Sequence, residues 1–227
     1  MRPRTAAVLT ALALLPLAGC SAASTTTAEV SYQIDERLTA LTIAARAAGV
    51  EIVTADGPVT VIEKHRYSKG KPDTTHRVDG QTLRLIDAGC GDDKVRCEVH
   101  YAIRMPKAMS AEITADAGAV KVDGLAGNLR ITTDAGAVEA RRLTSAEVTV
   151  TTDAGAASVE FAAPPTLVRT TTSFGPVDVR VPDTTAYALD IDTSVGKTTV
   201  NVDEDPASKH HITVRTDVGP VTIAHLP

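Results

Sequence analysis

The sequence is poor in aromatic residues: its 227 residues include no Trp, two Phe and four Tyr, which is 3% of the chain. Large aromatic rings usually fill a thick core, so their scarcity indicates a thin core of small aliphatic side chains. Basic residues are too few for nucleic-acid binding, because the formal net charge is -5 and phosphate recognition needs clustered Lys and Arg. A hydrophobic content of 43% argues against a disordered tail or a coiled coil.

The motifs of common active sites are missing as well. The chain has no Ser/His/Asp set, no phosphate-binding glycine loop and no His-rich ligand motif. His210, His211 and His225 stand near the end of the sequence and are interpreted as surface residues. We therefore expect no metal, no cofactor and no catalytic residue.

The first residues have the features of an export signal. Two arginines precede the apolar run 6–17, which is too short to span a bilayer as a permanent helix. The segment 17–20 (Leu-Ala-Gly-Cys) resembles a bacterial lipobox, and this resemblance implies removal of residues 1–19 as a signal peptide and lipidation of Cys20. The alternative is an ordinary secretory signal with an incidental Cys. Residues 20–29 lack apolar periodicity and are predicted to be a flexible tether.

The composition also suggests where such an anchor would hold the protein. The chain has eight Lys against fifteen Arg and only two Asn, which is typical of a GC-rich bacterial genome such as an actinobacterial one. In such a host we expect an extracytoplasmic protein, anchored by lipid to the outer face of the cell membrane.

The strongest pattern is a repeat of roughly twenty residues. Each copy contains Asp or Ser, then any residue, then Gly, and successive Gly residues are 18, 19, 20, 21 and 23 positions apart. Apolar residues recur five and three positions before the Asp or Ser and four and six positions after it, which is the period-two pattern of two half-buried strands around a bend. The residues that open the six bends are Asp116, Asp134, Asp153, Ser173, Ser194 and Asp217.

Such a unit cannot bury its apolar face alone. Parallel stacking of equivalent strands would give an all-β, β-solenoid-like structure, whose narrow interior suits small branched residues. The alternative is an antiparallel β-sandwich in which each bend is a hairpin tip. The solenoid is favoured because like residues recur in columns, which a sandwich does not require. We expect residues 110–227 to form the regular repeats and 30–227 to form one continuous domain.

Two columns beside the bend have predicted roles. The Asp or Ser that opens each bend is predicted to cap the turn by accepting a hydrogen bond from a backbone N–H. A cation held between the stacked carboxylates is the disfavoured alternative. Thr precedes this residue in most copies, as in Thr133 and Thr152, and is expected to face inward with its hydroxyl bonded to the turn backbone.

Residues 30–109 are less regular. We interpret 50–61 as an earlier copy of the repeat with its bend at Gly57. Residues 38–48 allow a short helix by composition, but Leu41, Ile43 and Ala45 alternate, which favours a strand.

The segment also contains two further cysteines. Outside the cytoplasm, and with Cys20 acylated, Cys90 and Cys97 are the remaining pair and are predicted to form a disulfide. A redox-active pair is disfavoured because the spacing is not Cys-x-x-Cys. A metal site that would add His100 is a further disfavoured alternative.

The repeats resemble a known family. The pattern strand, Asp-x-Gly-x-Val, strand, led into by residues 99–106 (VHYAIRMP), is similar to the bacterial domain family labelled "putative adhesin", a β-strand-repeat domain of unknown function. The resemblance covers roughly residues 50–227. It implies a membrane-anchored or lipidated envelope protein with a binding or scaffolding role, and it transfers no catalytic residue.

The sequence allows two classes of function. The favoured one is a non-enzymatic envelope lipoprotein that presents its sheet faces to a partner, either an envelope protein or wall glycan. The other is a polysaccharide-active β-helix enzyme, which normally needs paired carboxylates and aromatic platforms for sugar rings. After Tyr101 the only aromatic residues are Phe161, Phe174 and Tyr187, so the enzyme is disfavoured.

Overall fold

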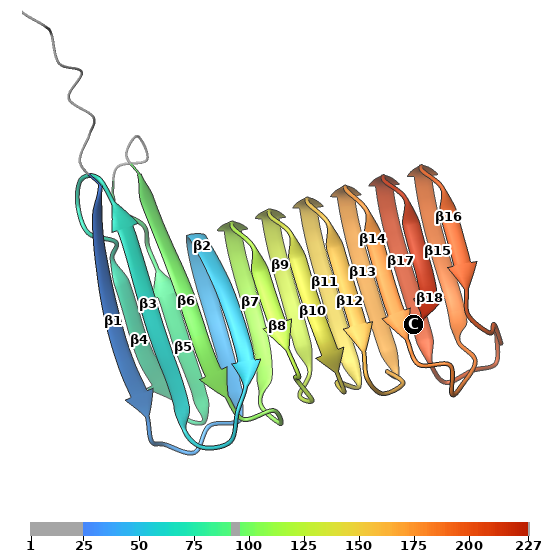
Figure 1. Cartoon of the computed structure of the whole chain (residues 1–227), viewed down its shortest axis with the longest axis horizontal. Helices are drawn as coiled ribbons and strands as arrows, with labels where there is room; N and C mark the ends of the chain where they lie inside the picture. The colour runs from blue at the N-terminus through green and yellow to red at the C-terminus, as the bar shows by residue number, and fades with distance from the viewer. Residues whose placement is uncertain (1–24, 92–95, 227) are drawn as a thin grey trace, which may run out of the picture.

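The computed structural model describes residues 25–91 and 96–226. Within these residues all regular structure is β, and eighteen strands form two facing sheets (Figure 1). The predicted all-β, β-solenoid-like fold is confirmed, because strands of successive repeats pair in parallel. A sandwich of hairpins would pair them antiparallel.

Six bent units, here called rungs, build the regular part of the structure. In each rung the strand before the bend joins one sheet, sheet B, and the strand after it joins the other, sheet A. The rungs are β7 (Ser110–Ala117) with β8 (Val120–Asp123), β9 (Leu129–Ala135) with β10 (Val138–Leu143), β11 (Glu147–Ala154) with β12 (Ala157–Phe161), β13 (Leu167–Phe174) with β14 (Val177–Val181), β15 (Ala188–Val195) with β16 (Thr198–Asn201), and β17 (His211–Val218) with β18 (Val221–His225).

The core lies between the sheets and consists of the predicted apolar columns. Ile131 pairs with Val150 in sheet B, Val120 pairs with Val138 in sheet A, and all four side chains are buried. Each such aliphatic side chain contributes about 1.5–3 kcal/mol when fully buried. Side chains at equivalent positions of neighbouring rungs are similar in size, so the distance between the two sheets stays nearly constant along the stack. Few aromatic rings fit into this narrow space.

Glycine at each bend lets neighbouring rungs approach closely. The N–H of Gly136 donates to the carbonyl of Ala154 at 2.9 Å, and equivalent bonds join the other bends. A Cβ on Gly155 would lie 2.0 Å from the carbonyl oxygen of Gly136, and this glycine has a φ of 156°. The bend therefore requires Gly for both its backbone conformation and its contact with the preceding rung.

The rungs do not stack in sequence order. The last rung, β17–β18, lies between β13–β14 and β15–β16, so β15–β16 forms the end of the stack (Figure 1). The inserted rung buries Ile212 and Val214 fully, whereas the end rung has an exposed Thr198 in a column otherwise filled by Val and Ala. The more apolar rung thus occupies the position with neighbours on both sides.

The N-terminal region extends both sheets beyond the rungs. Its strands are β1 (Thr26–Ile34), β2 (Ala40–Thr54), β3 (Val59–Tyr67), β4 (Thr74–Asp79), β5 (Thr82–Asp87) and β6 (Cys97–Met105). Strands β6, β3 and β1 continue sheet A, with β3 antiparallel to both neighbours, and β5 and β4 continue sheet B as an antiparallel pair.

Strand β2 is itself a rung, but with a different bend from the one expected. Leu41 pairs with Ala111 and Val50 pairs with Val120, so the chain bends near Gly49 and not at Gly57. The interpretation of 50–61 as a copy of the repeat is therefore wrong, since Gly57 lies between β2 and β3 at the opposite edge. The alternation of Leu41, Ile43 and Ala45 marked the true first half of this rung.

The start of β1 shortens the expected tether. Residues 26–29 pair with the end of β3 and belong to a strand, although the sequence shows no clear apolar alternation there. β1 is an edge strand whose side chains are mostly exposed, so pairing rather than burial holds it in place. Residues 1–19, Cys20 and the segment up to residue 24 lie outside the described residues.

Candidate functional site

The bends of the rungs form one long edge of the molecule, here called the bend edge. The predicted turn-capping residues Asp116, Asp134, Asp153, Ser173, Ser194 and Asp217 all lie on it, next to the bend glycines. Their side chains are exposed or half-buried, and none of them makes a hydrogen bond within residues 25–91 and 96–226. The backbone bonds between rungs hold the bend, and the structure gives no support to capping by these side chains.

The Thr column lies inside the bend, as its parity predicts. Thr133, Thr152, Thr172 and Thr216 are buried on successive rungs. Their hydroxyl oxygens have no hydrogen-bond partner, so the expected bonds to the turn backbone are not formed on these four rungs. On the end rung the hydroxyl of Thr193 donates to the carbonyl of the bend residue Gly219 at 3.4 Å. The column contributes packing through its methyl groups and carries the desolvation cost of its hydroxyls.

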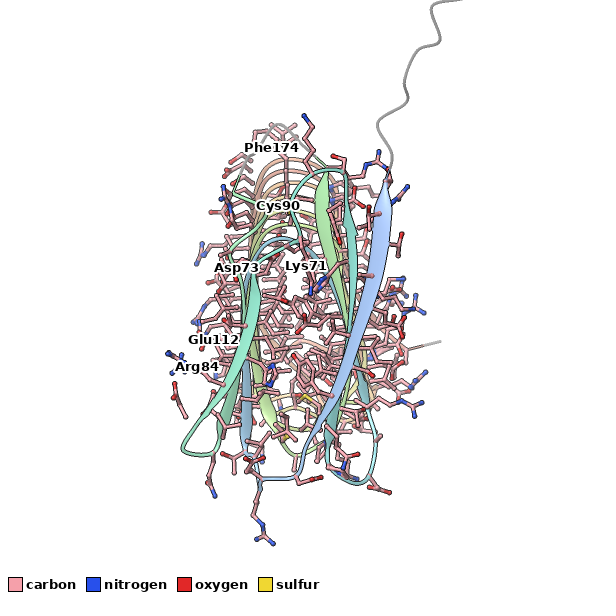
Figure 2. All side chains as sticks on the ribbon, turned by 90° about the vertical axis from the view of Figure 1, so that its left-hand side faces the viewer. Lys71, Asp73, Arg84, Cys90, Glu112 and Phe174 are labelled. Carbon is pink, nitrogen blue, oxygen red and sulfur yellow. A yellow bond between two sulfur atoms is a disulfide. The ribbon has the colours of Figure 1, made fainter. Side chains whose placement is uncertain are left out.

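The outer face of sheet B carries a row of charged and polar side chains, here called the charge ladder. In register across the strands the row reads Arg84, Thr42, Glu112, Arg130, Thr149, Arg169, Thr213 and Asp190. Figure 2 shows Arg84 and Glu112 on this outward side. A groove of about 410 Å³ runs beside them, with Asn128, Leu129 and Glu147 also in its lining.

A buried polar cluster lies between the sheets in the N-terminal region. Glu63 and His65 are 3% and 0% exposed, and Glu63 Oε2 lies 3.0 Å from His65 Nε2. The hydroxyl of Tyr32 donates to Glu63 Oε1 at 2.6 Å. Asp87 is buried in the facing sheet and accepts a hydrogen bond from the backbone N–H of Gly89 at 2.8 Å. Tyr101 completes the cluster, and its hydroxyl has no partner.

The two carboxyl groups of this cluster have opposite pKa shifts. Burial works against ionisation of Glu63, but hydrogen bonds donated by Tyr32, Thr74 and His65 outweigh it, and the pKa of Glu63 lies below its usual value. Burial raises the pKa of Asp87, and the Gly89 N–H offsets this only in part. Burial and the nearby Glu63 also raise the pKa of Tyr32.

Sequence reasoning missed this cluster, although a signal for it was present. Val59, Val61, Glu63 and His65 have the same parity on β3, so the period that buries the valines also buries the two polar residues. Because both are almost inaccessible to solvent, the cluster has no free access to a large substrate. It is best explained as a polar core that fixes the packing of this end.

The two remaining cysteines are joined. Cys90 and Cys97 form a disulfide with an S–S distance of 2.07 Å. Cys97 begins β6 and pairs in register with Tyr67 at the end of β3, so the bridge lies close to the bend edge. Since both sulfurs are used in this bond, they do not form a metal site with His100.

Two kinds of feature are absent from the described residues. Across 25–91 and 96–226 there is no group of three or more His, Cys, Asp or Glu side chains arranged to hold a metal ion. The same residues contain no helix that is long and apolar enough to cross a membrane.

The fold alone places the protein in a structural class, the two-sheet β-solenoids whose repeats bend at glycine. Comparison with known families identifies the particular one. Residues 43–224 match the family described as Toastrack DUF4097, and the chain belongs to this family. None of the curated proteins matches the chain.

One of the similar solved structures shares the fold. A "putative cell adhesion protein" from Clostridium sporogenes aligns with a TM-score of 0.55 and 15% identity, over 88% of this chain and all (100%) of that one. A "putative adhesin" from Parabacteroides distasonis aligns over 90% of this chain and 98% of its own length, with 10% identity and a TM-score of 0.37. At 15% identity the likeness to the Clostridium sporogenes protein concerns the fold alone.

Proposed function

We propose that this protein is a lipoprotein anchored through Cys20 to the outer face of the cell membrane, with a non-enzymatic, adhesin-like binding or scaffolding role in the envelope. The lipobox-like segment 17–20 supports the anchor. The name of the Clostridium sporogenes structure, which has the same fold, is consistent with adhesion.

The observation that carries the binding role is the charge ladder. Parallel stacking places Arg84, Glu112, Arg130 and Arg169 in one row on a long sheet face. Repulsion between neighbours is avoided because the directly paired charges, Glu112 and Arg130, are opposite and Thr149 separates Arg130 from Arg169. The face has no wide apolar patch, so it suits a polar contact spread over several rungs rather than one dry interface. An envelope protein or wall glycan is the partner class that fits such a face.

An enzymatic role has less support. The carboxylate and imidazole that lie within hydrogen-bond distance of each other, those of Glu63 and His65, are enclosed between the sheets. Glu112 and Glu147 line the groove beside the charge ladder, and they are the carboxylates to examine if glycan cleavage is observed. No aromatic side chain lines this groove to hold a sugar ring.

Two experiments test the proposal. Mass spectrometry of the mature N-terminal peptide should show diacylated Cys20, and an unmodified or differently cleaved N-terminus would refute the anchor. A pull-down from native envelopes should then recover one specific protein or wall glycan with the lipidated chain, using Cys20→Ala as the unanchored control.

The pull-down also distinguishes the face that binds. The double variant Arg130→Glu/Arg169→Glu on the charge ladder should lose the partner, while Arg180→Glu on the outer face of sheet A should retain it. Glycan that becomes shorter during incubation would favour the enzyme instead, and Glu112→Gln and Glu147→Gln would then identify the catalytic group.

A further inference from the structure

The bend edge changes character along its length. The residue before each bend glycine is exposed, and on the first three rungs of the repeat region it is Ala. On the last three stacked rungs it is Phe174, Val218 and Val195, which are paired in register and 61%, 41% and 62% exposed. These three side chains form a continuous apolar ridge on the molecular surface, and they are among the few large hydrophobic residues exposed anywhere in the described chain.

The charge of the edge changes at the same place. Beside the Ala rungs stand three carboxylates, Asp116, Asp134 and Asp153. Beside the apolar ridge stand Ser173, Asp217 and Ser194, so only one carboxylate remains. Loss of charge together with gain of apolar surface is the pattern of a patch that contacts an apolar environment.

The chain also enters the fold at this edge. Ala28 of β1 is level with His65, Val99 and Ala48, and Ala48 is next to the bend of β2 at Gly49. β1 therefore begins on the same side of the molecule as the bends, as Figure 1 shows, and Phe174 lies on that side in Figure 2. Lys69, exposed in the turn after β3, follows at the same edge.

The distance between the anchor and the fold is short. Five residues lie between Cys20 and Thr26, where β1 begins, and at full extension the six steps span at most about 20 Å. From β1 to β14 along sheet A there are seven strand steps, which is about 34 Å at the usual strand spacing. A lipid at Cys20 therefore holds one end of the bend edge near the membrane, with the apolar ridge on the same edge farther along.

We propose that the bend edge faces the membrane and that Phe174, Val218 and Val195 insert into its outer surface, giving the protein a second contact besides the lipid. This inference rests on the proposed lipidation of Cys20. The protein would then lie along the membrane, with the outer faces of both sheets standing upright and open to partners. Exposed cations such as Lys69 would be placed close to anionic headgroups.

A single-tryptophan reporter tests the inference, because the natural chain contains no Trp. Phe174→Trp is made in the full-length protein, which is expressed in a bacterium that processes lipoproteins. The mature form is reconstituted into phosphatidylcholine/phosphatidylglycerol vesicles with normal or brominated acyl chains. The matched control is Val53→Trp, which is 37% exposed on β2 near the opposite edge.

The expected result is that both proteins float with the vesicles. Emission of Phe174→Trp should be blue-shifted and reduced about twofold by brominated lipid, as for a side chain at the headgroup and acyl boundary, while Val53→Trp should be unaffected. Flotation without a blue shift of Phe174→Trp, or equal quenching of both reporters, would overturn membrane insertion and leave the anchor intact. A blue shift without quenching would also overturn it and indicate that a second copy covers the ridge. Failure of both proteins to float would overturn the anchor and the inference together.

Discussion

The space between the two sheets is filled by different kinds of side chain in the rungs and in the N-terminal region. In the rungs the interior consists mostly of aliphatic columns, and its buried polar side chains are uncharged: the Thr column, Thr170 and Ser145. In the N-terminal region the facing sheets enclose Tyr32, Glu63, His65, Asp87 and Tyr101. The difference is one of charge: among the described residues the stacked rungs bury only uncharged side chains, whereas the strands added at the N-terminal end enclose Glu63, His65 and Asp87.

The largest expected effect concerns the close contact that makes rungs stack. Gly155→Ala places a methyl group 2.0 Å from the carbonyl of Gly136 and should lower the free energy of unfolding by more than about 3 kcal/mol. Gly80→Ala in the N-terminal region has no atom within 4 Å of the new Cβ and should cost about 1 kcal/mol because of its positive φ alone. Urea denaturation of both variants measures the difference. Equal losses would show that close stacking does not distinguish the regions.

A second prediction tests the order in which the rungs stack. Ile212 and Leu189 are equivalent residues of similar size, but Ile212 is on the inserted rung and fully buried while Leu189 is on the end rung and half-buried. Ile212→Ala should cost about 3 kcal/mol, and Leu189→Ala about 1 kcal/mol. The reverse ranking in denaturant melts would indicate stacking in sequence order.

The polar core of the N-terminal region should make stability depend on pH. Ionised Glu63 accepts three hydrogen bonds, and Glu63→Gln should lower the free energy of unfolding at pH 7 by about 2 kcal/mol. The pKa of Glu63 is lowered on folding, so its contribution is complete above the unfolded value of about 4.3 and is lost as the pH falls through the folded value. The gap between wild type and variant should therefore narrow below about pH 4.

Denaturation at several pH values measures this gap. Glu98→Gln, an exposed carboxylate on β6, is the control and should change stability by less than about 0.5 kcal/mol at any pH. A gap for Glu63→Gln that stays constant down to acid pH would argue that the buried carboxyl is not ionised in the folded protein.

The smallest effect concerns the unpartnered hydroxyls inside the rungs. Thr152→Val keeps the shape of the side chain and removes a buried hydroxyl without a partner, so it should raise the free energy of unfolding by about 1 kcal/mol. Thr151→Val, on the outer face of the same strand, controls for strand propensity and should change it by less than about 0.5 kcal/mol. If Thr152→Val destabilises the protein, its hydroxyl makes a bond and the rung interior is more polar than the structure indicates.

Sequence reasoning performed differently in the two regions. In the rungs, the parity of Ile131, Val150 and Val159 predicted the buried faces, because the strand period acts on each residue independently of its neighbours. In the N-terminal region the same parity pointed to Glu63 and His65, yet charged residues are rarely assigned to a core. The early copy was misplaced because Gly57 resembles a bend glycine, although it connects β2 and β3 at the opposite edge.

For the six rungs of residues 110–225, the sequence by itself determined which apolar residues face inward, where the rungs bend and that they stack as a β-solenoid, since these follow from local backbone geometry repeated along the chain. Only the tertiary structure decided that β17–β18 is inserted before β15–β16, that Tyr32 and Glu63 meet through a hydrogen bond, and that the apolar ridge shares an edge with the start of β1. These are choices among partners distant in sequence. They depend on which arrangement buries the most apolar surface and forms the most backbone hydrogen bonds. Both totals are summed over the whole molecule, so they cannot be read from a local sequence pattern.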